Sequence, residues 1–168
     1  GIHANGLTLA RKIAQKLKTG YATKLLNGRM YGEELLKPTI IYSRLINDLL
    51  ESGIDIHYLV NITGHGWRKL MRAKKQFSYV LEKVPPVSDL FKFMQRHSAL
   101  SDKEMYGTFN MGAGFTAYID PKDSPRVLSI ARKNNIRALV AGYVVKGKKK
   151  VIIRPLNILY LESDLRIR

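Results

Sequence analysis

The chain has 168 residues, 45% of them hydrophobic and 25% charged, and its formal net charge is +16. This composition is typical of a folded domain that buries about 70% of its unfolded surface, and it excludes intrinsic disorder. The absence of cysteine excludes disulfides and thiolate catalysis, and four scattered histidines predict no metal site. No apolar run approaches the ~20 residues that span a bilayer and no signal peptide is visible, so we expect a cytoplasmic protein.

The first part of the chain has the periodicity of two helices. One begins at Asn5, which can cap it, and carries an apolar stripe through residues 10–17. Residues 19–38 predict a turn-rich connection. The second helix is predicted from Thr39 to Gly53, a glycine of the kind that often ends a helix.

Strands and helices then alternate after an apolar segment at residues 54–60. Strands are predicted at 76–84 and 113–119, with helices at 67–73, from Pro85 through Met94, at 101–106 and from Pro121 through Ala131. Residues 137–145 and 150–156 predict a hairpin with its tip at 146–149, and 158–161 a last short strand. The expected fold class is therefore α/β (α+β), a mixed β-sheet covered by helices, in a single domain over residues 1–168.

Two glycine-containing segments have the residues that bind a phosphate or an oxyanion. They are Asn61-Ile-Thr-Gly-His-Gly-Trp67 and Met105-Tyr-Gly-Thr-Phe-Asn-Met-Gly-Ala-Gly-Phe115, and a third such segment is Gly1-Ile-His-Ala-Asn-Gly6. Glycine lets the backbone approach a ligand, and a turn that leads into a helix presents N–H groups to an anion. The alternative interpretation is that these glycines only redirect the chain.

The candidate site residues come from these segments. His65 is a candidate catalytic acid or base, because its unperturbed pKa is about 6.5, or else a packing residue of the loop. Asn110 either binds a ligand or bonds its own backbone. The candidate substrate-binding residues are His3, Asn5, Gly6, Asn61, Thr63, Gly64, Gly66, Arg68, Asn110 and Gly112.

Two short runs hold nine of the 29 lysines and arginines. They comprise Arg68, Lys69, Arg72, Lys74 and Lys75, and then Lys146, Lys148, Lys149 and Lys150. Such runs form a solvated basic face, or they bind the phosphates of a nucleic acid with strong salt dependence. Nucleic acid is the less favoured partner, because aromatic residues are not interleaved with the runs and no nucleic-acid-binding motif is visible.

Four segments together resemble the C-terminal domain of aminoimidazole ribonucleotide synthetase. They are Gly1-Ile-His-Ala-Asn-Gly-Leu-Thr-Leu-Ala-Arg-Lys-Ile13, Leu36-Lys-Pro-Thr-Ile-Ile-Tyr42, Asn61-Ile-Thr-Gly-His-Gly66 and Glu104-Met-Tyr-Gly-Thr-Phe-Asn-Met-Gly112, in the order of that family. The family shows L-A-P-T-R-I-Y, H-I-T-G-G-G and E-M-Y-R-T-F-N-M-G in the last three segments.

The resemblance implies an ATP-dependent ligase. In that family ATP activates an amide oxygen of formylglycinamidine ribonucleotide, and ring closure gives aminoimidazole ribonucleotide, ADP and phosphate. ATP and Mg²⁺ are held by an N-terminal domain, through which members dimerise. Because this chain begins at Gly1 within a family motif and lacks that domain, we expect a separated C-terminal domain, inactive alone, that positions a phosphorylated small-molecule substrate.

The sequence departs from the family pattern at three motif positions. Asn61 stands where the family has His, His65 where it has Gly, and Gly107 where it has Arg, while residues 146–168 match no family segment that we can place. Relatives with the same architecture act on other substrates, including formylglycinamide ribonucleotide, thiamine phosphate and selenide. Because of the substitutions at 61, 65 and 107, the alternative function is a non-catalytic regulatory paralogue with the same fold.

Overall fold

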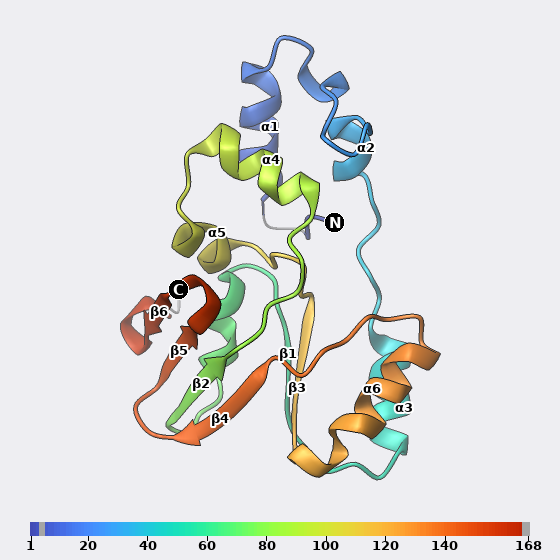
Figure 1. Cartoon of the computed structure of the whole chain (residues 1–168), viewed down its shortest axis with the longest axis vertical. Helices are drawn as coiled ribbons and strands as arrows, with labels where there is room; N and C mark the ends of the chain where they lie inside the picture. Colours follow the sequence, from blue (N-terminus) through green and yellow to red (C-terminus); the bar gives the residue numbers. More distant parts are fainter. Residues whose placement is uncertain (4–5, 166–168) are drawn as a thin grey trace.

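The computed structural model describes residues 1–3 and 6–165, and Figure 1 shows three groups of elements. Helices α1 (Leu7–Lys16), α2 (Tyr31–Leu35) and α4 (Asp89–Ser98) pack together at one end. Helices α3 (Ser43–Glu51) and α6 (Ser124–Lys133) form a pair at the other end. Helix α5 (Asp102–Thr108) and a β-sheet lie to the left of that pair in this view.

Local signals set most of the helices. The apolar stripe of α1 buries Ala10, Ile13 and Ala14, as its periodicity predicts. The Ser88 hydroxyl accepts a hydrogen bond from the backbone N–H of Phe91 at the start of α4. At the start of α5, Ser101 and Glu104 form a reciprocal capping box. None of the helices in the described part of the chain combines the length and the apolar character needed to cross a membrane.

The second helix begins later than predicted. It starts at Ser43 rather than Thr39, and Ile41 is 81% exposed. The Tyr42 ring stacks on the ring of Phe115 at a centroid distance of 5.2 Å, and this contact holds Tyr42 against the strand that begins at Phe115. Residues 37–42 therefore cross between the two helical groups without helical turns (Figure 1).

The strands form two sheets, so the expected mixed α/β architecture is confirmed with two sheets and helices. Strands β1 (Ile56–Asn61) and β3 (Phe115–Ile119) make an antiparallel pair in which Asn61 lies opposite Phe115. The second sheet has the order β4-β2-β5-β6, with β2 (Phe77–Leu81), β4 (Gly142–Lys146), β5 (Lys150–Ile153) and β6 (Ile158–Leu161).

The predicted hairpin between residues 137–145 and 150–156 is wrong. Strand β2 lies between β4 and β5, antiparallel to β4 and parallel to β5. The turn between them crosses the start of β2, where the Ser78 hydroxyl donates to the Lys148 carbonyl at 2.8 Å. Four extended Cα steps reach about 13 Å, enough to cross two strand spacings of about 4.8 Å each. Sequence proximity therefore indicated a direct pairing that the tertiary structure does not form.

Two hydrophobic clusters support these elements. The larger unites α1, α2, α4, α5 and the four-stranded sheet around buried residues such as Trp67, Phe91 and Tyr106. The smaller contains Leu45, Leu49 and Ala131 and holds α3 against α6. The candidate site lies on the larger cluster, where the end of β1 leads into the 3₁₀ helix η2 (Gly66–Met71).

Candidate functional site

The three glycine-containing segments meet in space, although up to 109 positions separate them. The Asn110 side-chain amide donates to the Gly1 carbonyl at 3.2 Å. The His3 ring has a hydrogen bond with the backbone of Ile62. The Trp67 indole N–H donates to the Asn110 carbonyl at 2.9 Å. One site is thus built from residues near 1–3, 61–69 and 106–114.

Gly66 is required by the packing of one segment on another. Its φ is +51°, and a Cβ there would lie 2.1 Å from the Tyr106 carbonyl oxygen and 2.8 Å from the Gly107 carbonyl carbon. The Gly66 N–H is also used, because it donates to the Thr63 carbonyl at 2.8 Å. This glycine therefore serves the contact between η2 and the end of α5.

Asn110 is held on every side by the chain. Only 5% of its surface is exposed, and its side-chain oxygen accepts from the Gly112 N–H at 3.0 Å. Its side-chain amide donates to Gly1 and its backbone carbonyl accepts from Trp67, so Asn110 connects the three segments. Its predicted contact with a ligand stays a prediction.

Arg68 is bound to backbone carbonyls of this chain. Its guanidinium donates to Gly107 at 2.6 and 3.0 Å, to His65 at 3.2 Å and to Asp164 at 3.0 Å. A Cβ at Gly107 would lie 3.6 Å from the Arg68 Nε, so Arg68 occupies the space beside this position. The chain thus lacks the arginine that the family has at position 107, but the guanidinium of Arg68 lies beside this position.

Lys69 appears in the sequence analysis within a basic run but not among the candidate site residues. It is 8% exposed, and its ammonium donates to the Asn61 side-chain oxygen at 2.7 Å and the Thr63 hydroxyl at 2.8 Å. Burial, and then the charge of Arg72, lower the pKa of Lys69. Lys69 lies three residues after Gly66, one turn of the 3₁₀ helix, and both residues are buried.

His65 occupies the turn in a left-handed conformation, with φ of 78°. The Arg72 guanidinium lies 3.3 Å from its Nδ1. Because arginine only donates, Nδ1 accepts, and a neutral ring then carries its proton on Nε2. The catalytic role of His65 stays a prediction.

His3 is half-buried between the other segments. Its Nδ1 has no hydrogen-bond partner in the described part of the chain. Burial lowers the pKa of His3, while the hydrogen bond with Ile62 opposes this effect in part. A neutral imidazole is therefore favoured at this place.

The remaining candidates occupy the edges of the site. Gly64 lies half-buried in the turn after Thr63. Gly6 and Gly112 both have positive φ and are packed closely, against Phe109 and Pro86 respectively. Asn5 lies outside the described residues.

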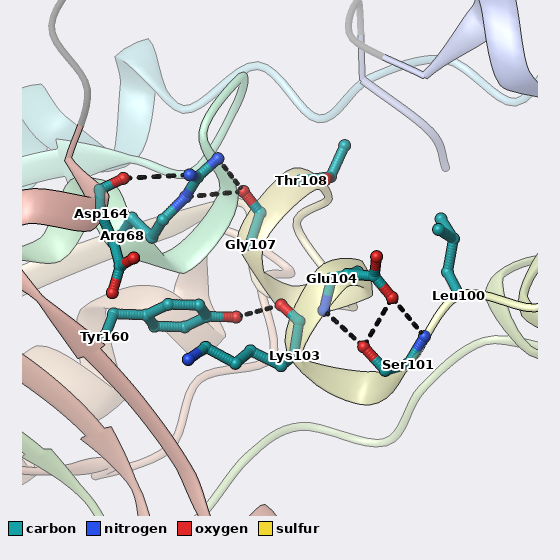
Figure 2. A pocket seen from close by; sticks show the side chains of 9 residues that line it. All are labelled: Arg68, Leu100, Ser101, Lys103, Glu104, Gly107, Thr108, Tyr160 and Asp164. Carbon is teal, nitrogen blue, oxygen red and sulfur yellow. Dashed lines mark hydrogen bonds between the residues drawn. The ribbon is translucent and has the colours of Figure 1, made fainter.

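A pocket of about 350 Å³ opens beside this region (Figure 2). Helix α5 supplies Lys103 and Glu104 to its wall, and Tyr160 comes from β6. The hydrogen bonds that Ser101 gives it lower the pKa of Glu104. Arg68 is the one candidate site residue that lines this pocket. No group of three or more His, Asp or Glu residues able to hold a metal occurs in residues 1–3 and 6–165.

The fold and the site define a mixed α/β domain whose glycine segments converge on one place. The family model described as "AIR synthase related protein, C-terminal domain" matches residues 1–154. The chain therefore belongs to this family, which confirms the resemblance predicted from the four sequence segments.

Several curated relatives carry the name phosphoribosylformylglycinamidine cyclo-ligase. The relative from Methanocaldococcus jannaschii is 41% identical over 147 residues, covering 86% of this chain and 42% of the relative. One from Methanococcus maripaludis strain C5 is 37% identical over 145 residues, covering 86% and 41%. One from Rippkaea orientalis is 35% identical over 158 residues, covering 91% and 46%. The chain thus spans less than half the length of these relatives.

Proposed function

We propose that this chain is the C-terminal, substrate-side domain of an ATP-dependent cyclo-ligase of purine biosynthesis. The domain positions formylglycinamidine ribonucleotide against ATP and Mg²⁺ bound by an N-terminal domain. Family membership and the names of the relatives support this assignment. The observation that carries it is the convergence of the family's segments, through Asn110, Gly1 and Trp67, on one place.

The residues of the site suit a phosphorylated substrate better than a metal-bound nucleotide. Lys69, Arg72 and His65 gather around the turn without a cluster of carboxylates in the described residues. Magnesium–ATP sites need carboxylate oxygens, so the proposal assigns ATP to the N-terminal domain. Positioning of the substrate against the nucleotide is a large part of catalysis in phosphoryl transfer.

An apolar strip next to the start of the chain suits contact with that domain. Leu36 is 83%, Ile40 54% and Ile41 81% exposed, and Gly1 lies against the backbone of Lys37. Exposed apolar residues that gather in this way mark interaction surfaces. In this proposal the N-terminal domain covers the strip, and the full protein is a cytoplasmic homodimer.

An NMR titration of the chain with formylglycinamidine ribonucleotide tests the substrate assignment. We expect saturable shifts confined to residues near 3–6, 61–69 and 107–112. Shifts scattered over the surface, or none at millimolar ligand, would contradict binding by this domain. Duplex DNA at two salt concentrations is the comparison, because Arg68 is bound to backbone carbonyls and only part of the first basic run remains for the phosphates of a duplex.

Turnover is tested by fusing the chain to the N-terminal part of the Methanocaldococcus jannaschii relative. We expect the fusion to form aminoimidazole ribonucleotide with release of ADP, and the chain alone to form none. Tight substrate binding without turnover in the folded fusion would favour the regulatory alternative.

A further inference from the structure

Lys69 is 8% exposed as a residue, and the hydrogen-bond partners of its ammonium group are neutral. Its two hydrogen-bond partners are the Asn61 amide oxygen and the Thr63 hydroxyl. None of the carboxylates in residues 1–3 and 6–165 forms an ion pair with it. The ammonium therefore has no counterion among these residues, and an anion that approaches from solvent would supply one.

The hydrogen bonds of Lys69 also fix which atoms face outward. Lysine only donates, so Asn61 must turn its oxygen, and Thr63 a lone pair, toward the ammonium. The amide hydrogens of Asn61, the hydroxyl hydrogen of Thr63 and the third ammonium hydrogen then have no acceptor among the described residues. All of these remaining groups are donors, which is the requirement of an anion.

The surroundings of this cluster are open and positively charged. Asn61 is exposed and Thr63 half-buried, so solvent reaches the cluster from the end of β1. Arg72 is exposed next to His65 and adds a second cation. The guanidinium of the neighbouring Arg68 donates hydrogen bonds to the backbone carbonyls of Gly107, His65 and Asp164. Lys69, rather than Arg68, is thus the cation placed to meet a ligand.

We propose that Asn61, Thr63 and Lys69 bind a phosphate group, with the ammonium of Lys69 as its main counter-charge. The inference rests on the proposed function and deepens it by naming the residues that hold the phosphate. A tetrahedral oxyanion offers several acceptor oxygens to donors that lie close together, and hydrogen bonds to charged groups are the strong ones. The phosphate belongs either to the ribonucleotide substrate or to the inorganic phosphate that the reaction releases.

Heteronuclear NMR of the lysine side chains tests the proposal on the unaltered chain. The probes are inorganic phosphate, ribose 5-phosphate and ribose. We expect saturable shifts of the Lys69 Cε and Nζ signals with one or both phosphates and none with ribose. A response to ribose 5-phosphate at a lower concentration than to inorganic phosphate would assign the site to the substrate, and the reverse order to the released phosphate. Unmoved Lys69 signals with both phosphates would overturn the proposal.

The variant Lys69→Met, with Lys75→Met as its matched control, measures the contribution to affinity. Both changes remove one positive charge from the same run, but Lys75 is exposed. We expect Lys69→Met to weaken phosphate binding roughly 10- to 100-fold and Lys75→Met to leave it within about twofold. Equal affinities of the two variants would overturn the proposal, and the NMR result on the unaltered chain decides the matter if Lys69→Met does not fold.

The outcomes separate this inference from the proposed function. Binding of formylglycinamidine ribonucleotide that leaves Lys69 unmoved and survives Lys69→Met would overturn the inference alone. Phosphate binding at Lys69 without any binding of that ribonucleotide would overturn the substrate assignment alone.

Discussion

At the scale of single residues, much of the site consists of groups that bind the chain to itself. Asn110 and Arg68 form their hydrogen bonds with other parts of this chain. Both side chains donate to backbone carbonyls, and the Asn110 carbonyl accepts from the Trp67 indole. Gly66 removes a side chain where two backbones meet. These residues hold the turn at Thr63 in place, while Asn61, Thr63 and Lys69 are the residues that we propose bind a phosphate.

Gly66→Ala should destabilise the fold. The new Cβ meets the Tyr106 carbonyl oxygen at a positive φ, so we expect a loss of about 2–4 kcal/mol in the free energy of unfolding. Gly53→Ala is the control, because Gly53 also has positive φ but no atom within 4 Å of an added Cβ. It should lose about 1 kcal/mol. Equal losses in denaturant unfolding would contradict the close contact at Gly66.

His3 should make the stability of the chain depend on pH. Burial lowers the pKa of His3 in the folded state, so the unfolded state binds more protons below about pH 6.5. Stability is therefore fully present above pH 6.5 and decreases as the pH falls through the folded-state pKa. We expect His3→Gln to show a smaller fall in melting temperature between pH 7 and pH 5 than the unaltered chain. Parallel pH profiles of the two proteins would rule out this contribution.

At the scale of elements, the insertion of β2 between β4 and β5 depends on one glycine. A Cβ on Gly142 would lie 1.9 Å from the Val80 carbonyl oxygen and 2.9 Å from the Leu81 Cα. The pairing of β4 with β2 thus needs a residue without a side chain at the start of β4. Strand β2 follows η2 along the chain, so its pairing with β4 helps to hold η2, which carries part of the site, in position.

Gly142→Ala tests the strand order. We expect faster amide hydrogen exchange in β2 and β4 and a loss of about 1–3 kcal/mol, because the added methyl group separates the two backbones. Val144→Ala, on the same strand and 39% exposed, should leave exchange in β2 nearly unchanged. Unaltered exchange in Gly142→Ala would show that β4 does not approach β2 as closely as described.

At the scale of the whole molecule, two hydrophobic clusters of unequal size divide the stability. The larger cluster supports the site, and the smaller joins α3 to α6 at the far end (Figure 1). Few buried residues hold this helical pair, so it should open without unfolding of the rest.

Leu49→Ala should expose this division. Leu49 is 2% exposed in the smaller cluster, and its truncation should cost about 2–4 kcal/mol locally. We expect amide protection to fall in α3 and α6 and to persist in α4. Leu90→Ala, in the larger cluster and 1% exposed, should lower protection throughout. A uniform loss of protection in Leu49→Ala would show that the two clusters unfold together.

The family, the fold class and the helices with strong local signals could be predicted from the sequence. The stripe of α1, the Ser88 cap and the capping box of α5 depend on residues a few positions apart, so they are readable along the chain. The glycine segments were recognisable for the same reason, since each is a short run of residues.

The tertiary structure alone decided the strand order, the start of α3 and the direction in which each basic side chain points. The Lys69 ammonium donates to Asn61 and Thr63 near the end of β1, and the Arg68 guanidinium donates to carbonyls of α5 and of residue 164. These contacts join residues far apart in the chain or on different faces of a turn. Periodicity and composition describe only neighbours along the sequence, so they indicated a single basic run. In the folded chain, Arg68 and Lys69 are bound to other residues, whereas the other cations of that run are exposed.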